Sequence, residues 1–140
     1  MSIQEIIADA LVPQPIQMAK TYIQSRLANR DMVRHNYILG DTDDYWHRLA
    51  IAQQSRKGPL SGARALMFGF LNELKDIGRD TLLGGKPFSE AVEASIKDLQ
   101  RNEDGYRIGR EVGWHGDLEK ALEPYKNKSL RDWEQKYKGK

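Results

Sequence analysis

Apolar residues recur at steps of three and four along nearly the whole chain, and this period most constrains what its 140 residues can fold into. Such spacing places apolar side chains on one face of an α-helix. No stretch of useful length alternates apolar and polar residues as a half-buried strand does. The pattern therefore predicts an all-α fold, a compact bundle of six to seven helices in a single domain.

Prolines divide the first helical pattern. Ser2 and Glu5 fit a capping box that begins an amphipathic helix. The apolar face of that helix is formed by Ile3, Ile6, Ile7 and Ala10. Pro13 and Pro15 each remove a backbone donor, so we expect two short helices hinged at the prolines, the second over 16–28. The expected buried side of the second helix comprises Ile16, Ala19, Ile23 and Leu27.

Capping residues and loops delimit the helices that follow a short helical turn and loop over 29–42. Thr42 or Asp43 caps the next helix, which ends at Gly58 and Pro59. The strongest pattern covers 60–80, with a stripe formed by Leu60, Ala63, Met67, Phe70, Leu71, Leu74 and Ile77. A long helix over 89–111 has one face formed by Val92, Ile96, Leu99, Glu103 and Tyr106. Two shorter helices, capped by Asp117 and Ser129, complete the prediction.

Glycines interrupt two of these predicted helices, where each costs up to about 1 kcal/mol relative to alanine. Gly62 and Gly69 lie in the strongest helix, and Gly105, Gly109 and Gly113 recur every four residues in the long one. Charged neighbours exclude membrane helix packing there. The glycines predict close approach of neighbouring helices, although Gly62 and Gly69 also fit a plain helix weakened by glycine.

Composition and charge divide the chain into three parts and exclude several classes. There is no cysteine, so disulfide scaffolds, thiolate zinc sites and cysteine nucleophiles are excluded. A charged fraction of 30% with a net charge of +2 describes a surface of mixed sign. We expect no Sec signal and no membrane span, because the longest apolar run is far below about 18 residues. The expected parts are an N-terminal amphipathic helical hairpin (1–28), a helical core module (29–116) and a basic helical tail (117–140).

Two clusters could carry chemistry. Asp44 lies one helical turn before His47, where a carboxylate would raise the basicity of the imidazole. If the helices on either side of Gly58 pair antiparallel, His47 comes near Glu73 and Asp76. This predicts a catalytic group of His47, Glu73 and Asp76. With His35, the same region offers a ligand set for a divalent metal: His35, His47 and Glu73. The alternative is a polar network or a solvated acidic stripe.

The tail supplies a second kind of candidate site, for nucleic acid. Its cations are Lys126, Lys128, Arg131 and Lys136, and its interleaved aromatics are Tyr125, Trp133 and Tyr137. Cations can contact phosphates and aromatic rings can stack on bases. The alternative is a solvated terminal helix whose aromatics pack on the core. The chain has no P-loop, dinucleotide-binding or hydrolase-elbow motif.

Three spaced patterns together resemble a known helical module. Asp44-x-x-His47 is followed by Gly69-x-x-x-Glu73-x-x-Asp76, and then by Asp98-x-x-x-Asn102-x-x-Gly105-x-x-x-Gly109. Over about 43–111 the chain resembles a small helical module of phage and prophage proteins and of Rhs-type C-terminal regions. Related modules often have a cysteine after the histidine, where this chain has Arg48. The resemblance implies a mobile-element or secretion setting rather than a reaction.

These observations lead us to expect a phage-type virion-associated or internal protein that acts through contacts with other phage or host proteins. Its expected place is the virion or the host cytoplasm, and its docking element is the N-terminal helix, through Ile3 and Ile7. We expect no cofactor, with a divalent metal left open. The alternatives are a toxin-like or cell-wall-directed hydrolase that is metal-dependent or uses His47 as a base, and a protein that binds nucleic acid through the tail.

Overall fold

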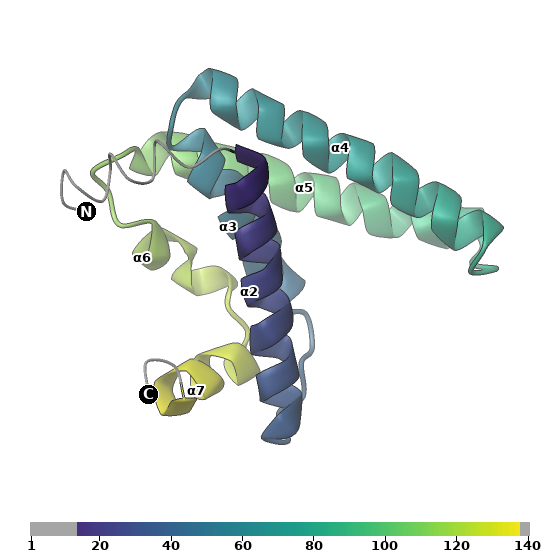
Figure 1. Ribbon diagram of the computed structural model, residues 1–140, viewed down its shortest axis with the longest axis horizontal. Helices are drawn as coiled ribbons and strands as arrows, with labels where there is room; N and C mark the ends of the chain where they lie inside the picture. The colour runs from purple at the N-terminus through teal and green to yellow at the C-terminus, as the bar shows by residue number, and fades with distance from the viewer. Residues whose placement is uncertain (1–13, 138–140) are drawn as a thin grey trace.

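The computed structural model describes residues 14–137, and this part of the chain is built from helices without a strand (Figure 1). The all-α prediction is confirmed. In chain order the elements are α2 (Gln14–Arg34), α3 (Asp43–Ser55), α4 (Pro59–Leu82), α5 (Phe88–Val112), α6 (Leu118–Leu122), the 3-10 turn η1 (Glu123–Tyr125) and α7 (Lys128–Tyr137). Asp117 caps α6 as predicted, because its carboxylate accepts from the Lys120 amide at 3.1 Å.

Helix α2 is longer than predicted. It continues past Ala28 to Arg34, and the predicted short turn over 29–42 is therefore wrong in its first part. The helix ends where Asn36 adopts a left-handed conformation with φ of 67°. The amides of Asn36 and Tyr37 then bond back to Val33 and Met32, which satisfies the last carbonyls of the helix.

The predicted buried side of α2 is also wrong, because all four of its residues point outward: Ile16, Ala19, Ile23 and Leu27. The buried side contains Gln17 and Thr21 instead, followed by Ala28 and Met32. Gln17 accepts from the Gln54 amide of α3, and the Thr21 hydroxyl donates to Gln53 of α3 at 2.6 Å. Polar contacts therefore fix α2 on α3, and hydrophobic period alone does not reveal them. The first predicted helix, with Ser2 to Ala10, lies outside the described residues.

Glycines allow the long helices to approach closely, as predicted. A Cβ atom on Gly105 of α5 would lie 2.7 Å from the Arg48 carbonyl oxygen of α3. A Cβ atom on Gly62 of α4 would lie 2.6 Å from the Tyr106 ring of α5. Helix α5 is therefore the central element, with α3 on one side and α4 running antiparallel beside it (Figure 1).

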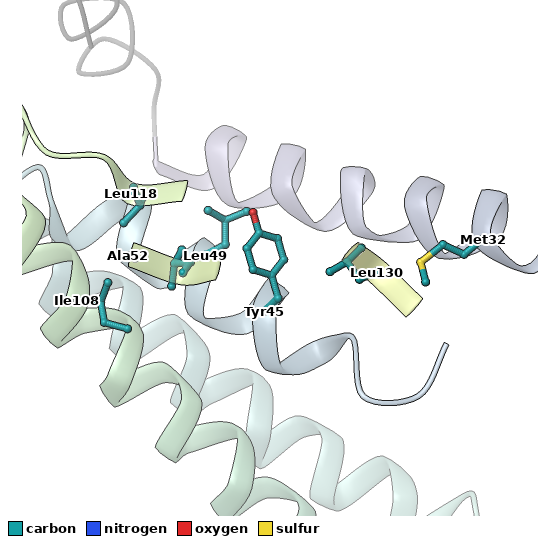
Figure 2. Close-up of a cluster of buried hydrophobic side chains, with 8 residues drawn as sticks. Met32, Tyr45, Leu49, Ala52, Ile108, Leu118 and Leu130 are labelled. Atoms are coloured by element: carbon teal, nitrogen blue, oxygen red, sulfur yellow. The ribbon is translucent and has the colours of Figure 1, made fainter. Parts of the chain in front are cut away.

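The core lies between α2, α3, α5 and the C-terminal helices (Figure 2). Its buried side chains are Met32, Tyr45, Leu49, Ala52, Ile108, Leu118, Leu122 and Leu130. Helix α7 begins at a cap formed by Asn127, not Ser129 as predicted, because the Asn127 side-chain oxygen accepts from the Leu130 amide at 2.9 Å. The same side chain donates to the Leu39 carbonyl at 2.6 Å. Asn127 therefore ties α7 to the loop before α3.

The predicted apolar stripe on α4 exists, and most of its residues are exposed. Leu60, Met67, Phe70 and Leu74 are exposed, whereas the buried residues of α4 are Gly62, Ala65 and Glu73. Small residues and one carboxyl group face α5 because the two backbones approach too closely for larger side chains. The distal part of the α4–α5 pair extends away from the other helices (Figure 1).

Candidate functional site

Arg101 of α5 is the centre of a polar cluster that joins α5 to α3 and to the loop before α3. Its side chain is only 7% exposed, and its guanidinium donates to Asp41, Asp44 and Asp98 at 2.6, 2.7 and 2.6 Å. Burial alone would raise the pKa of Asp44, but the hydrogen bond and charge of Arg101, with Arg48, hold that pKa below its usual range. Asp44 is therefore held in its ionised form and paired with Arg101.

Arg48 of α3 extends the cluster toward the C-terminal elements. It pairs with Asp44 at 3.3 Å and with Asp104 of α5 at 2.9 Å. Its guanidinium carbon lies 4.1 Å from the centre of the Tyr125 ring in η1, within the range of a cation–π contact. Arg48 stands where related modules often have a cysteine, and here it serves as a junction of three elements.

Glu73 of α4 is the most perturbed carboxyl group of the cluster. Burial raises its pKa to about 7, and the charges of Asp98 and Asp76 add to this effect, while a hydrogen bond with Ser95 opposes it. Glu73 is therefore partly protonated near neutral pH, at a position between α4 and α5.

His47 of α3 lies close to Asp98. Its Nε2 lies 3.6 Å from an oxygen of Asp98, and its side chain is 33% exposed. The structure therefore brings the predicted residues His47 and Glu73 to Asp98, whereas Asp76 acts on Glu73 through its charge and pairs with Arg79 at 3.1 Å. Sequence reasoning did not select Asp98 or Arg101 as site residues. Their one-turn spacing on a helix and the place of Asp98 in the third spaced pattern are the signals that could have found them.

The predicted metal ligands are not assembled. His35 lies near the C-terminal end of α2, where its ring packs at 3.9 Å from that of Tyr137 and its Nδ1 is 3.4 Å from Asp31. Residues 14–137 contain no group of three histidine or acidic side chains that could hold a metal ion, so His35, His47 and Glu73 form no such group.

The predicted tail cations are largely engaged within the fold. Lys126 is 6% exposed and pairs with Glu123 at 2.9 Å and with Glu134 at 2.7 Å. Burial would lower the pKa of Lys126, but these two hydrogen bonds outweigh it and raise that pKa. Lys128 pairs with Asp132 at 2.7 Å, and Arg131 donates to the Lys126 carbonyl at 2.9 Å. The ammonium group of Lys136 lies 5.6 Å from the centre of the neighbouring Tyr137 ring.

The tail aromatics pack on the rest of the molecule, as the alternative interpretation predicts. Trp133 donates from its indole nitrogen to Asp31 at 2.8 Å, and both Trp133 and Tyr125 pack against the hydrophobic core. The Tyr137 ring packs against His35. These rings are therefore occupied by contacts within the protein.

A groove of about 910 Å³ lies between α2, α3, α6 and α7. Trp46, His115 and Trp133 contribute to its lining, together with Arg56 and Glu134. The Arg56 guanidinium donates to the carbonyls of 113, 114 and 116, and Glu134 accepts from Lys126. The polar groups of this groove therefore hold the C-terminal elements in place.

No part of residues 14–137 covers one apolar side of the α4–α5 pair. At about 100° per residue, the exposed apolar residues of α4 lie about a quarter turn from the residues that face α5, and α5 shows the same relation. Because the helices are antiparallel, both stripes fall on the same side of the pair, and α3 packs on the opposite side. We name this surface the hairpin face. It comprises Ala63, Met67, Phe70, Leu74 and Ile77 of α4 and Phe88, Val92, Ile96 and Leu99 of α5.

Large apolar side chains of the hairpin face are half exposed or more on both helices. Met67 is 61% exposed, Phe88 is 64% exposed and Ile96 is 50% exposed. Among the described residues, no helix is both long and apolar enough to cross a bilayer. An apolar surface made by two helices over several turns marks an interaction site rather than scattered exposure.

Comparisons of the chain with protein-family models, with curated proteins and with solved structures find no match. The resemblance to the helical module of phage and prophage proteins therefore stays a prediction. The hairpin face and the cluster around Arg101 and Asp98 are the two features of the described residues that bear on function.

Proposed function

We propose that this protein is a non-enzymatic interaction protein whose contact surface is the hairpin face. The observation that carries the proposal is the exposure of large apolar side chains on both helices of one pair, on a face that contributes no residue to the core cluster. Phe70 and Leu74 are about half exposed, so covering each contributes roughly half of the about 1.5–3 kcal/mol gained by burying a fully exposed side chain. A bound partner that covers this face would therefore gain a substantial free energy of association.

The setting we propose is that of a virion-associated or internal phage component, acting on other phage or host proteins. The resemblance over 43–111 supports this setting, and the mixed-sign surface agrees with a protein that meets other proteins. The N-terminal docking element with Ile3 and Ile7 lies outside the described residues. The hairpin face is a separate contact surface.

Site-specific crosslinking in producing cells tests the proposal. A photoreactive phenylalanine analogue placed at Leu71, at the edge of the hairpin face, should form covalent adducts with a protein. The same analogue at Glu119, an exposed residue of α6, is the matched control and should form few. Adducts at both positions alike, or at neither, would contradict a contact through this face.

A second candidate is the His-based hydrolase, favoured by one observation. His47 and Glu73 meet the same carboxylate, Asp98, and the pKa of Glu73 is raised to about 7. A histidine oriented by an acid can act as a general base toward water, and Asp76 modulates the pair through its charge. In this mechanism Glu73 holds a proton below about pH 7.

Activity measurements decide this second candidate. Purified protein is assayed against peptidoglycan and nucleic acid across pH 5–8, with and without divalent metals. His47→Ala should abolish turnover while the circular dichroism spectrum stays unchanged, and Glu73→Gln should alter the pH profile. Absence of turnover by the unaltered protein under all these conditions would exclude the hydrolase.

A further inference from the structure

Two contacts between α2 and α3 give the direction of the groove that these helices form with α6 and α7. Gln17 near the start of α2 accepts from Gln54, and Asn29 further along α2 accepts from Thr42 at 3.1 Å. The two helices are therefore antiparallel. One end of the groove lies beside the start of α2, where Gln17 lines it, and the groove follows α2 for about 16 Å to Ala28.

The far end of the groove is mainly apolar. Its lining residues there are Leu27, Ala28, Tyr45, Trp46 and Trp133. Leu27 is 57% exposed, so the rest of residues 14–137 leaves much of this side chain uncovered. The indole N–H of Trp46 is buried without an acceptor among these described residues, whereas buried donors are normally paired. This end of the groove is therefore suited to an occupant with apolar side chains and backbone carbonyls.

We propose that this occupant is the segment 3–10 of the same chain, packed antiparallel to α2 as the first half of the predicted helical hairpin. These residues lie outside the described part of the chain. At about 100° per residue, the apolar residues of a helix over 3–10 share one face: Ile3, Ile6, Ile7 and Ala10. Glu5 and Asp9 fall on the opposite face and point to solvent. The isoleucines then meet Leu27 and Trp46 in the groove.

The connection to α2 is long enough for this packing. Ala10 and Gln14 are four residues apart, so their Cα atoms lie at most about 14 Å apart. Packed helices lie about 8–10 Å apart, which lets Ala10 reach the height of Gln17. Ile3 is about 10.5 Å further along and then stands at the height of Gln24, which lines the groove. The segment therefore follows the groove toward its apolar end.

Three features favour this segment over a separate partner. The tether holds it beside the groove at an effective concentration on the order of millimolar. Pro13 disfavours a helical conformation for the residue before it, so a turn rather than one continuous helix joins the segment to α2. The groove lining includes the acids Asp117, Glu119 and Glu134. The segment presents no acid to them, because both of its own acids are on its other face.

The groove and the hairpin face are formed by different elements, so this inference goes beyond the proposed function and does not rest on it. The side chains of Ile3 and Ile7, expected from the sequence to dock on another protein, are assigned to the groove of their own chain. The hairpin face then remains as the surface for other proteins.

Disulfide formation in the purified full-length protein tests the inference. The chain has no cysteine, so introduced thiols are the only ones present. Ile3→Cys combined with Gln24→Cys should form an intramolecular disulfide at least about 10-fold faster than a matched pair. The matched pair is Ile3→Cys combined with Tyr22→Cys, because Tyr22 is 59% exposed and about 200° around α2 from Gln24. Equal rates, or disulfides that join two chains, would overturn this assignment.

Quenching of tryptophan fluorescence by acrylamide gives a second measurement, because Trp46 and Trp133 line the groove. Ile7→Asp should release the segment and increase the quenching. Ala8→Asp, on the polar face, is the matched control and should leave the quenching unchanged, and both variants should still unfold cooperatively in urea. Unchanged quenching in Ile7→Asp would also overturn the assignment. Loss of the Leu71 adducts with normal disulfide formation would overturn the proposed function alone.

Discussion

A single guanidinium holds three carboxylates at one junction of the molecule. Arg101 contacts Asp41, Asp44 and Asp98 from a position that is almost fully buried. Removing one member of such a buried group leaves the others without compensation, which costs more than the group contributes as a whole. The cluster therefore makes the position of α5 against α3 depend on the charge and geometry of one side chain.

We expect Arg101→Met to lower the free energy of unfolding by about 3–5 kcal/mol, because three buried or half-buried carboxylates would then face one another. Arg107→Met is the matched control, since Arg107 is on the same helix but is 56% exposed, and its effect should be much smaller than that of Arg101→Met. Urea unfolding at neutral pH measures both. Equal losses of unfolding free energy would show that Arg101 contributes no more to stability than an exposed arginine.

Glu73 predicts a pH dependence of stability whose sign is opposite to that of a salt-bridged acid. Its pKa of about 7 in the folded protein lies above the ordinary glutamate value of 4.5. Between these two pH values the folded protein therefore binds more protons than the unfolded chain. Stability is then fully present below about pH 4.5 and falls as pH rises through 7, by up to about 3 kcal/mol. Glu73→Gln should remove this fall and stabilise the protein at pH 8.

Thermal unfolding between pH 4.5 and 8 measures this effect. The control is Glu119→Gln, at an exposed position of α6. A flat profile for unaltered protein, or a profile that Glu73→Gln leaves unchanged, would show that Glu73 does not carry a raised pKa. The circular dichroism spectrum of both variants should match that of the unaltered protein, because Gln keeps the size and hydrogen-bonding capacity of Glu.

Residue spacing predicts part of the polar cluster. Helix pairing across the Gly58 turn correctly brings His47 near Glu73, since both positions follow from counting along two helices. Asp98 and Arg101 lie on a third helix whose rotation is set by Gly105 and Gly109, and counting gives no access to that rotation. Closeness in sequence predicts that His35 joins the cluster. Helix α2 continues beyond Ala28, however, and His35 at its end lies against Tyr137.

At the scale of elements, glycine decides how closely two helices pack. Gly109→Ala should destabilise the protein by about 1–3 kcal/mol, because its Cβ atom would clash with the Ala52 backbone and the Ser55 side chain. Gly78→Ala is the matched control on α4, where a Cβ atom meets nothing within 4 Å. This control should stabilise by about 0.5–1 kcal/mol through better helix propensity. Denaturant unfolding gives both values, and the same sign for both would contradict close packing at Gly109.

Helix boundaries are predicted well where glycine and proline end a pattern. The bounds of α3, α4 and α5 agree with the sequence expectation to within about two residues. Which side of a helix is buried is predicted poorly. Period shows that Ile16 and Ile23, or Met67 and Leu74, share a face, but not which neighbour covers that face. On α4 the small residues at Gly62 and Gly69 face inward, and on α2 the amide side chain of Gln17 does.

At the scale of the whole molecule, the first and last described helices, α2 and α7, are in contact. Asn127 bonds Leu39 across 88 positions, and Trp133 bonds Asp31 across 102. Leu130 from α7 and Met32 from α2 are both in the core. The basic tail of the sequence analysis is therefore an integral layer of the fold.

Asn127→Ala should lower the free energy of unfolding by about 1–2 kcal/mol, since it removes a helix cap and leaves the Leu39 carbonyl without this donor. Ser129→Ala, at the position that the sequence predicts as the cap, should change it by less than about 0.5 kcal/mol. Chemical denaturation of the two variants measures the difference. A larger loss of unfolding free energy for Ser129→Ala than for Asn127→Ala would show that Ser129 is the cap of α7.

Contact between the first and last described helices also has a consequence for biosynthesis. A ribosome releases α2 and α3 long before it has added Asn127 and Trp133, so their shared surface around Met32 stays open for most of translation. Helices α4 and α5 can pair earlier, because only a short loop separates them. The α4–α5 pair is therefore complete while the core still lacks Leu130 of α7.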